Sequence, residues 1–194
     1  MAEQKLKGKK VAIIAADMVE RVELEKPRKA LEQAGATTEL LSIKPGKIEA
    51  FDHFDKAKAI KVDRLIEEAE PSEYDALMIP GGVGNPDQLR GDEDAVSFVR
   101  GFFDEGKPVA AICHAPWVLV EAGVARGRTL TSWPTLQTDV RNADGKWVDE
   151  EVVVDGNLVT SRKPDDIPAF NEKMIELFAS ATPAKQRQKA KAAH

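Results

Sequence analysis

The stretch PVAAICHAPWVLVEAG, residues 108–123, decides the fold that we predict for this chain. Its first part, Pro108–Ile112, is a short apolar run, which is typical of a strand buried on both faces. Residues Ala115–Ala122 then form a predicted helix, and Gly123 ends it. Cys113 stands between the two. The stretch therefore predicts a strand, a sharp turn and a helix, with a cysteine at the turn.

The same alternation of strand and helix continues on both sides of this stretch. Repeated strand–helix–strand units predict an α/β fold: a flavodoxin-like three-layer sandwich with a mostly parallel sheet and helices on both faces. We expect one domain over residues 1–184. The predicted strands are Lys10–Ala16, Thr37–Ile43, Asp75–Ile79, Pro108–Ile112, Val152–Val154 and Leu158–Thr160, with a short one near Leu130. The predicted helices are Val22–Ala34, Leu65–Ala69, Asp94–Glu105, Ala115–Ala122, Leu136–Asn142 and Asp165–Ala179, and Lys47–Asp63 is expected to form a hairpin of short strands.

Composition excludes several classes of protein. The chain has 194 residues, 42% hydrophobic and 31% charged, with a net charge of −5, and it contains no apolar run long enough to span a membrane. The last ten residues, 185–194, hold four basic residues and no acid, and we expect them to form a disordered tail outside the domain. The acidic remainder argues against nucleic acid as a partner. A single cysteine forms no intramolecular disulfide, which favours a reducing, cytoplasmic location.

Three segments follow predicted core strands, namely Asp17–Glu20, Pro80–Gly84 and Cys113–His114. In an open parallel sheet, sites lie beyond the carboxyl ends of the strands, so we expect these segments to converge. A cysteine at the start of a helix has its thiolate stabilised by the helix dipole and free N–H groups, which predicts a lowered pKa and a nucleophile. The alternative is a buried structural cysteine, which is common.

Neighbouring groups extend this site. His114 is the one histidine beside the predicted nucleophile and is suited to carry its proton, although adjacent side chains on a turn usually point apart. The alternative is a histidine that supports the site or an interface. Glu20 and Glu23 lie three residues apart, and a protonated Glu20 pointing towards Cys113 would donate a hydrogen bond to sulfur. The alternative is that both acids simply stabilise a helix start.

Backbone N–H groups complete the predicted site. The Pro80-Gly81-Gly82 turn offers the N–H groups of Gly81 and Gly82, which together with that of His114 are candidates to hold a developing oxyanion. Glycine turns after strands are common, so this signal is weak by itself. One cysteine and no HExxH pattern give no metal cluster, and the sequence calls for no cofactor.

Several motifs carry a family resemblance. ALMIPGG (76–82), EGKPVA (105–110), AICHAP (111–116) and GRTLTSWPTLQTDVRNAD (127–144) resemble the PfpI branch of the ThiJ/PfpI family. VERVEL (19–24) and WVDEEVVVDGNLVTSRKPDD (147–166) match it as well, so the resemblance covers about residues 9–180. It implies a flavodoxin-like fold akin to class I glutamine amidotransferase domains.

The resemblance also implies roles for residues. Cys113 matches the family nucleophile, Glu20 the acid that hydrogen-bonds it, and His114 the histidine that follows the cysteine in PfpI members. A carboxylate from a neighbouring subunit completes the proposed triad in those members, and its counterpart here is Asp87, with one extra residue in the preceding loop. The resemblance thus implies a homodimer or a higher assembly such as a hexamer, with the site at or near the interface.

Family activities leave the function open. The chain is expected to be a stress-protection protein with a cysteine-dependent hydrolase or lyase activity on small reactive carbonyls, of the glyoxalase or deglycase type. One alternative is an intracellular cysteine peptidase with a Cys-His-Asp/Glu triad. The other is a non-enzymatic redox sensor or chaperone, because an accessible cysteine without a resolving partner oxidises to sulfenic and sulfinic acid.

Overall fold

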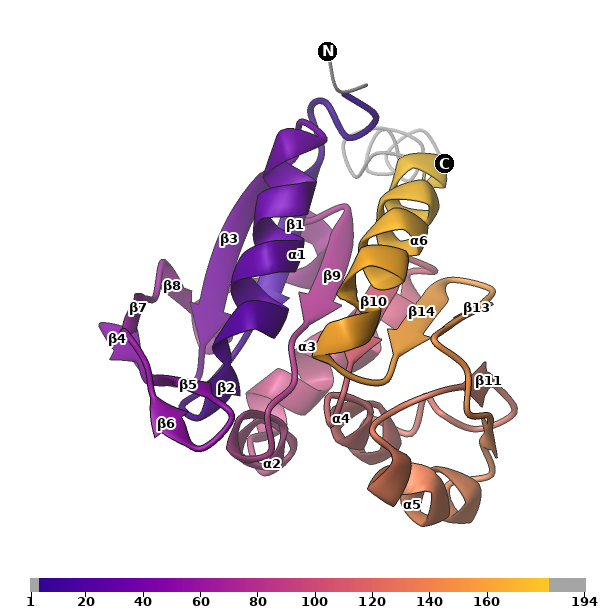
Figure 1. Cartoon of the computed structure of the whole chain (residues 1–194). Helices are drawn as coiled ribbons and strands as arrows, with labels where there is room; N and C mark the ends of the chain where they lie inside the picture. Colours follow the sequence, from indigo (N-terminus) through magenta and orange to yellow (C-terminus); the bar gives the residue numbers. More distant parts are fainter. Residues whose placement is uncertain (1–3, 182–194) are drawn as a thin grey trace.

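The structure, a computed structural model, describes residues 4–181 and is built on a seven-stranded sheet (Figure 1). The strand order is β13-β14-β10-β9-β1-β3-β8, and every neighbouring pair is parallel except β13 with β14. The strands of this sheet are β1 Lys10–Ile14, β3 Thr37–Ser42, β8 Arg64–Leu65, β9 Ala76–Ile79, β10 Val109–Ile112, β13 Val152–Asp155 and β14 Leu158–Ser161. The predicted flavodoxin-like sandwich with a mostly parallel sheet is confirmed.

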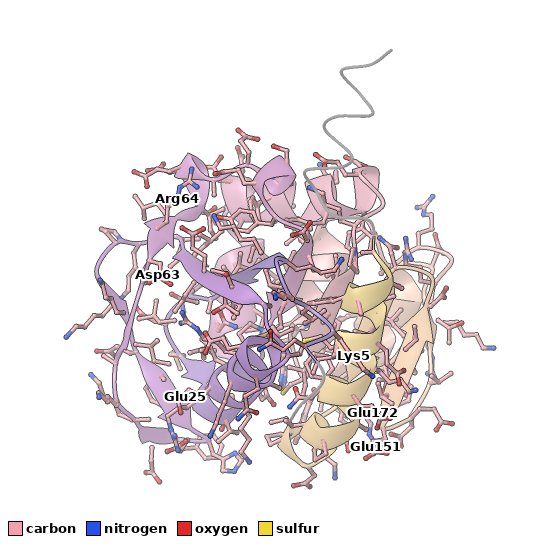
Figure 2. All side chains as sticks on the ribbon, turned by 90° about the horizontal axis from the view of Figure 1, so that it is seen from above. Lys5, Glu25, Asp63, Arg64, Glu151 and Glu172 are labelled. Carbon is pink, nitrogen blue, oxygen red and sulfur yellow. The ribbon has the colours of Figure 1, made fainter. Side chains whose placement is uncertain are left out.

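Helices cover both faces of the sheet. The helix α1 (Arg21–Gln33) packs against α6 (Ile167–Ser180) on one face. The opposite face is covered chiefly by α3 (Glu93–Asp104), with α2 (Gly84–Arg90) and α4 (Pro116–Glu121) beside it. Figure 2, seen from above, shows the sheet between these two layers, with Arg64, Asp63 and Glu25 on one side of the view and Lys5, Glu172 and Glu151 on the other.

Alternate residues of each central strand enter two separate cores. On β1, Val11 and Ile13 join the core beneath α1 and α6, whereas Ala12 and Ile14 join the core beneath α3 and α4. This alternation follows from the two-residue period of a strand. It explains why the central strands are continuous apolar runs: both faces of the sheet are covered, so every position of β9 and β10, and every position of β1 after Lys10, is buried.

Smaller elements complete the chain. The predicted hairpin region is confirmed as short strands, with β5 pairing antiparallel with β6 and β4 with β7. These and the remaining elements are β2 Val19–Glu20, β4 Lys47–Ile48, β5 Ala50–Asp52, β6 Asp55–Lys56, β7 Ile60–Lys61, β11 Thr129–Leu130, α5 Gln137–Asn142 and β12 Lys146–Trp147, with 3₁₀ turns at Ile66–Glu68, Pro71–Glu73, Pro134–Leu136 and Pro164–Asp166.

The helix α2 was not predicted from the sequence. It opens with Gly84, Asn85 and Pro86, of which only the last two are buried, and its one large apolar core residue is Leu89. So short a helix shows no hydrophobic period. The predicted tail, 185–194, lies outside the described residues. Among residues 4–181, no helix has the length and apolar character needed to cross a membrane.

Candidate active site

The three predicted segments meet at the carboxyl edge of β1, β9 and β10. They surround a cavity of about 280 Å³. Its walls are Glu20, Glu23, His53, Phe54, Gly82, Val83, Cys113, His114, Trp133 and Pro164. The predicted convergence is therefore confirmed, because residues far apart in the sequence share one cavity.

Cys113 occupies a sharp turn between β10 and α4. Its φ of +66° lies in the left-handed region, which costs a residue with a Cβ roughly 1–3 kcal/mol. Backbone hydrogen bonds hold the turn on both sides: the Cys113 N–H donates to Ser161 O at 3.0 Å, and its carbonyl accepts from the Trp133 N–H at 2.8 Å. The sequence prediction of a sharp strand-to-helix turn is confirmed. The strain directs the side chain out of the sheet and into the cavity.

The sulfur of Cys113 is buried, with 6% of the residue exposed. The backbone N–H groups of Gly82 and His114 hydrogen-bond to it and stabilise negative charge on sulfur. His114 approaches from the side, with Nδ1 3.2 Å from Sγ. The turn thus achieves a direct contact between adjacent cysteine and histidine side chains.

His114 is held as a neutral imidazole between two tryptophans. Its ring stacks on Trp133 at 5.7 Å between centroids and meets Trp117 edge-on at 5.3 Å. Burial lowers the pKa of His114 to about 4, because the imidazolium would lose its hydration. A neutral imidazole at 3.2 Å is suited to accept the thiol proton.

The acid beside the sulfur is Glu23, which corrects the prediction that Glu20 fills this place. Glu23 is fully buried, its Oε2 accepts the Gly81 N–H at 3.0 Å, and its carboxyl group hydrogen-bonds to Cys113. Its Oε1 is buried, and no N–H or O–H group of residues 4–181 donates to it. Oε1 needs no donor when it carries the carboxyl proton of Glu23 itself. Glu23 lies inside α1, where its side chain faces the sheet, whereas Glu20 lies in the extended strand β2.

Burial decides the protonation of the Glu23–Cys113 pair. It raises the pKa of Glu23 to about 8, and the negative charge of Glu20 adds to the rise. Burial and the charge of an ionised Glu23 raise the pKa of Cys113, against the N–H groups of Gly82 and His114. The structure thus contradicts the predicted lowering of that pKa, because desolvation outweighs the hydrogen bonds that Gly82 and His114 donate to the sulfur. Near neutral pH Glu23 keeps its proton, so its charge no longer opposes a thiolate.

Glu20 lines the same cavity on the other side. Its Oε2 accepts the backbone N–H of His53 at 3.0 Å, and the ring Nδ1 of His53 lies 3.8 Å away. His53 has a φ of +57° at the turn between β5 and β6, and this conformation points its N–H at the carboxylate. The hairpin thus binds Glu20 and fixes its carboxylate at the wall of the cavity.

Gly81 and Gly82 differ in the groups to which their backbone N–H groups donate. The Gly81 N–H donates to Glu23, so the prediction that it serves a developing oxyanion is corrected, whereas the Gly82 N–H hydrogen-bonds both to the sulfur of Cys113 and to Glu23. Gly81 is also the point of closest approach: a Cβ there would lie 2.5 Å from Glu23 Oε2 and 2.6 Å from Cys113 Cβ. Glycine is therefore required at position 81, because Glu23 and Cys113 lie too close for a Cβ.

Residues 9–177 match the model of the DJ-1/PfpI family. The chain belongs to the DJ-1/PfpI family. Among the relatives, the "Protein/nucleic acid deglycase 2" of Escherichia coli is 42% identical over 89% of this chain and 99% of its own. The "Deglycase PfpI" of Pyrococcus furiosus is 40% identical over 87% and 99%, and the "Putative cysteine protease YraA" of Bacillus subtilis 39% identical over 88% and 99%.

Solved structures of the DJ-1/PfpI family share the fold. A two-domain protein of Anabaena variabilis, with DJ-1/ThiJ/PfpI-like and ferritin-like domains, superposes with a TM-score of 0.82 at 37% identity. The match covers 87% of this chain and 47% of that one, so this chain spans about half of the two-domain protein. DJ-1beta of Drosophila melanogaster gives a TM-score of 0.81 at 28% identity over 94% of this chain and 96% of its own.

Asp87, the predicted third member of a triad, lies away from the cavity of this DJ-1/PfpI chain. Its carboxylate accepts from Arg90 at 2.8 Å and is 58% exposed on α2. The Arg90 guanidinium lies over the ring of Trp117, 4.5 Å from its centroid, and Trp117 in turn contacts His114. Within one chain Asp87 therefore reaches the histidine only through two intervening side chains.

Sequence reasoning missed several residues that line this cavity. His53, Phe54, Val83 and Trp133 form its outer wall, and Phe54 is 98% exposed at the tip of the β5–β6 hairpin. The one signal for them was an aromatic residue in a region expected to be a hairpin, since exposed aromatics often mark binding surfaces. In the described part of the chain, no group of three or more His, Cys, Asp or Glu side chains is arranged to hold a metal.

Proposed function

We propose that this protein is a cysteine-dependent enzyme of the deglycase or glyoxalase type, which protects the cell by converting small reactive carbonyls to hydroxyacids. One observation carries the proposal: the sulfur of Cys113 lies in a cavity of about 280 Å³ between an uncharged proton acceptor and a protonated acid. Such a cavity is at or below the lower end of the usual range for ligand pockets, about 300–1,000 Å³, and suits a small substrate.

The names of the relatives support this reading. Those from Escherichia coli and Pyrococcus furiosus are named deglycases, and the one from Bacillus subtilis a putative cysteine protease. All three names are compatible with a reactive cysteine. The size of the cavity favours a small carbonyl compound.

The reaction begins with addition of sulfur to the aldehyde carbon of a 2-oxoaldehyde. The thiol proton passes to Nδ1 of His114 and from there to the carbonyl oxygen, which gives a hemithioacetal. The N–H groups of Gly82 and His114 stabilise the sulfur while it is charged.

Proton transfers then convert this adduct to a thioester of Cys113. His114, neutral again after the first step, removes the proton from the former aldehyde carbon, and an enediol forms. A proton is returned at the neighbouring carbon, so the first carbon is oxidised to a thioester while the second is reduced to an alcohol. Water cleaves the thioester, releases the 2-hydroxyacid and returns the thiol. Each electron pair stays within the substrate, and no external oxidant is required.

A second candidate is a peptidase that uses the same cysteine and histidine, as the name of the Bacillus subtilis relative suggests. Peptide hydrolysis needs a groove for an extended chain and a group that keeps His114 oriented. The ring of His114 contacts Sγ of Cys113 and two tryptophans, and no hydrogen bond or ion pair joins it to a carboxylate of residues 4–181. A carboxylate from a second copy would have to supply that orientation.

We propose that the protein associates with itself over the exposed apolar rim of the cavity. Phe54, Val83 and Met18 are 98%, 57% and 49% exposed and lie around its mouth. A second copy placed there would shield these side chains from water and bring its own Asp87, which is exposed one turn from Val83, towards His114.

A reducing, cytoplasmic location remains part of this proposal, since the lone cysteine is free.

The test follows the loss of methylglyoxal and the formation of lactate by freshly reduced wild type, Cys113→Ser and His114→Gln. Turnover by wild type that Cys113→Ser abolishes is the expected result. Absence of turnover, while Cys113 still reacts with a thiol reagent, would contradict the proposal. Hydrolysis of a casein substrate by the same samples would then favour the peptidase, and oxidation of Cys113 by peroxide without either activity would favour a sensor.

A further inference from the structure

The cavity around Cys113 contains an uneven set of charges. Of its ten lining residues two are glutamates and none is lysine or arginine. Glu23 is protonated near neutral pH and His114 is neutral, for the reasons given above. Glu20 is left as the fixed charge of the wall.

The carboxylate of Glu20 is not neutralised by a basic side chain. The residue is 7% exposed, and its partner is the backbone N–H of His53, with the His53 ring 3.8 Å away and 78% exposed. The neighbouring Arg21 points elsewhere and pairs with Asp52 and Glu25. No lysine or arginine of residues 4–181 forms an ion pair with Glu20.

Apolar groups around the mouth strengthen the effect of this charge. Phe54, Val83 and Trp133 line the mouth of the cavity with apolar side chains, and Glu20 itself is only 7% exposed. Charges interact more strongly where water is excluded, because the effective dielectric constant falls. An anionic group brought into this cavity would lose its hydration, face a carboxylate and find no cation.

We propose that Glu20 determines the charge specificity of the site: it excludes carbonyl adducts that carry a carboxylate and admits neutral and cationic ones. The proposal rests on the function proposed above and extends it to the class of substrate. Adducts of 2-oxoaldehydes with amino or guanidino compounds and with neutral thiols fit this class, and adducts with acidic thiols do not. Each adduct first releases its amine or thiol, as the hydroxyl proton of the adduct passes through His114 to the departing nitrogen or sulfur, and Cys113 adds to the aldehyde that remains. Glu20 is thus a specificity residue, and the bond-making groups remain Cys113 and His114.

The experiment compares hemithioacetals of methylglyoxal with thiols that differ in charge. The matched pair is 3-mercaptopropionate and 3-mercaptopropionamide, which have nearly the same size, and thiocholine supplies a permanent cation. Lactate release, less the release from free methylglyoxal at its equilibrium concentration, gives kcat/KM for each adduct. For wild type we expect the amide adduct to be favoured over the carboxylate adduct by about tenfold or more, which corresponds to about 1.4 kcal/mol.

Variants assign the effect to Glu20. Glu20→Gln keeps an oxygen that accepts the His53 N–H, and we expect its ratio of amide to carboxylate adduct to fall towards one. Asp55→Asn removes the same charge from an exposed position on the β5–β6 hairpin and should leave the ratio as in wild type. Glu20→Asp, which keeps the charge, should retain most of the preference.

The outcomes separate the two proposals. Turnover of all three adducts by wild type at equal kcat/KM would overturn the charge specificity and leave the proposed function intact; this result needs no variant. A preference that persists unchanged in a folded Glu20→Gln protein would overturn the assignment to Glu20. No turnover of any adduct by reduced wild type would overturn the proposed function, and this inference with it.

Discussion

Replacing Glu23 with glutamine should change how the stability of the protein depends on pH. In the folded protein burial raises the pKa of this carboxyl group from 4.5 to about 8. Between these values the folded state holds a proton that the unfolded state has lost. Stability therefore falls as the pH rises through this window. Glutamine keeps the shape and the oxygen that accepts the Gly81 N–H, but it has no proton to lose.

The magnitude follows from the size of the shift. One pKa unit corresponds to about 1.4 kcal/mol, so wild type should lose about 3–4 kcal/mol relative to Glu23→Gln between about pH 5 and about pH 8. His114 acts in the opposite direction, because a pKa of about 4 in the folded state means that stability falls as the pH drops below about 6.5. The difference between the two proteins cancels this contribution, since both contain His114.

Urea unfolding at four pH values across this window, under reducing conditions, measures the difference. The control is Glu25→Gln, a glutamate-to-glutamine change on the same helix at a half-exposed side chain. Its curve should run parallel to that of wild type. The reasoning is refuted if the wild-type and Glu23→Gln free energies of unfolding run parallel from about pH 5 to about pH 8.

Three further changes test the packing and chemistry of the site. Gly81→Ala puts a Cβ 2.5 Å from Glu23 Oε2, so we expect near-complete loss of turnover and about 1–3 kcal/mol of destabilisation. The control Gly91→Ala, whose Cβ would have its nearest neighbour 3.5 Å away, should change little. Thermal melts and lactate assays measure both variants, and equal behaviour of the two would contradict the close approach at Gly81. His114→Gln should lower kcat by about 10²–10⁴-fold without changing the circular dichroism spectrum, and an unchanged kcat would remove the histidine from proton transfer. Asp87→Asn leaves the cavity of its own chain intact. If Asp87 acts across an interface, kcat should fall only under conditions in which light scattering shows an assembly. The same kcat under all conditions would exclude such a role.

Burial patterns explain why most of the fold was predictable. The strands β1, β9 and β10 are covered on both faces, and full burial requires the apolar runs that the sequence shows. The helix α3 combines an Asp92 N-cap with an apolar stripe and was expected within one residue at each end. In contrast, α2 has only seven residues and opens with glycine, asparagine and proline, so it has no period to detect.

The site was predictable only where backbone geometry determines it. A cysteine between a buried strand and a helix has to lie at the sheet edge, and the sequence places Cys113 and His114 there. Glu20 and Glu23 are three residues apart and look alike in sequence. What separates them is that Glu20 ends β2 in an extended conformation, whereas Glu23 lies within α1 and faces the sulfur. That difference depends on the strand pairing of β2 with β5, which no local pattern reveals.

The contribution of His53 was also beyond local patterns. It lies in the turn of the β5–β6 hairpin with a positive φ, and its backbone N–H binds a carboxylate 33 residues earlier in the chain. In the sequence, His53 is a histidine between Asp52 and Phe54, and no motif there indicates a site. Only the folding of the hairpin over the sheet edge brings it to the cavity.

The central claim is that Cys113 forms a covalent bond with the carbonyl substrate during turnover. The direct measurement is rapid quenching of reduced wild type and Cys113→Ser with methylglyoxal, followed by intact-mass analysis and peptide mapping. Our account predicts a transient adduct with the mass of one methylglyoxal on the peptide that contains Cys113, formed no more slowly than lactate and absent from Cys113→Ser. Lactate formation by Cys113→Ser at the wild-type rate, or turnover of wild type with Cys113 unmodified at every time, would contradict it.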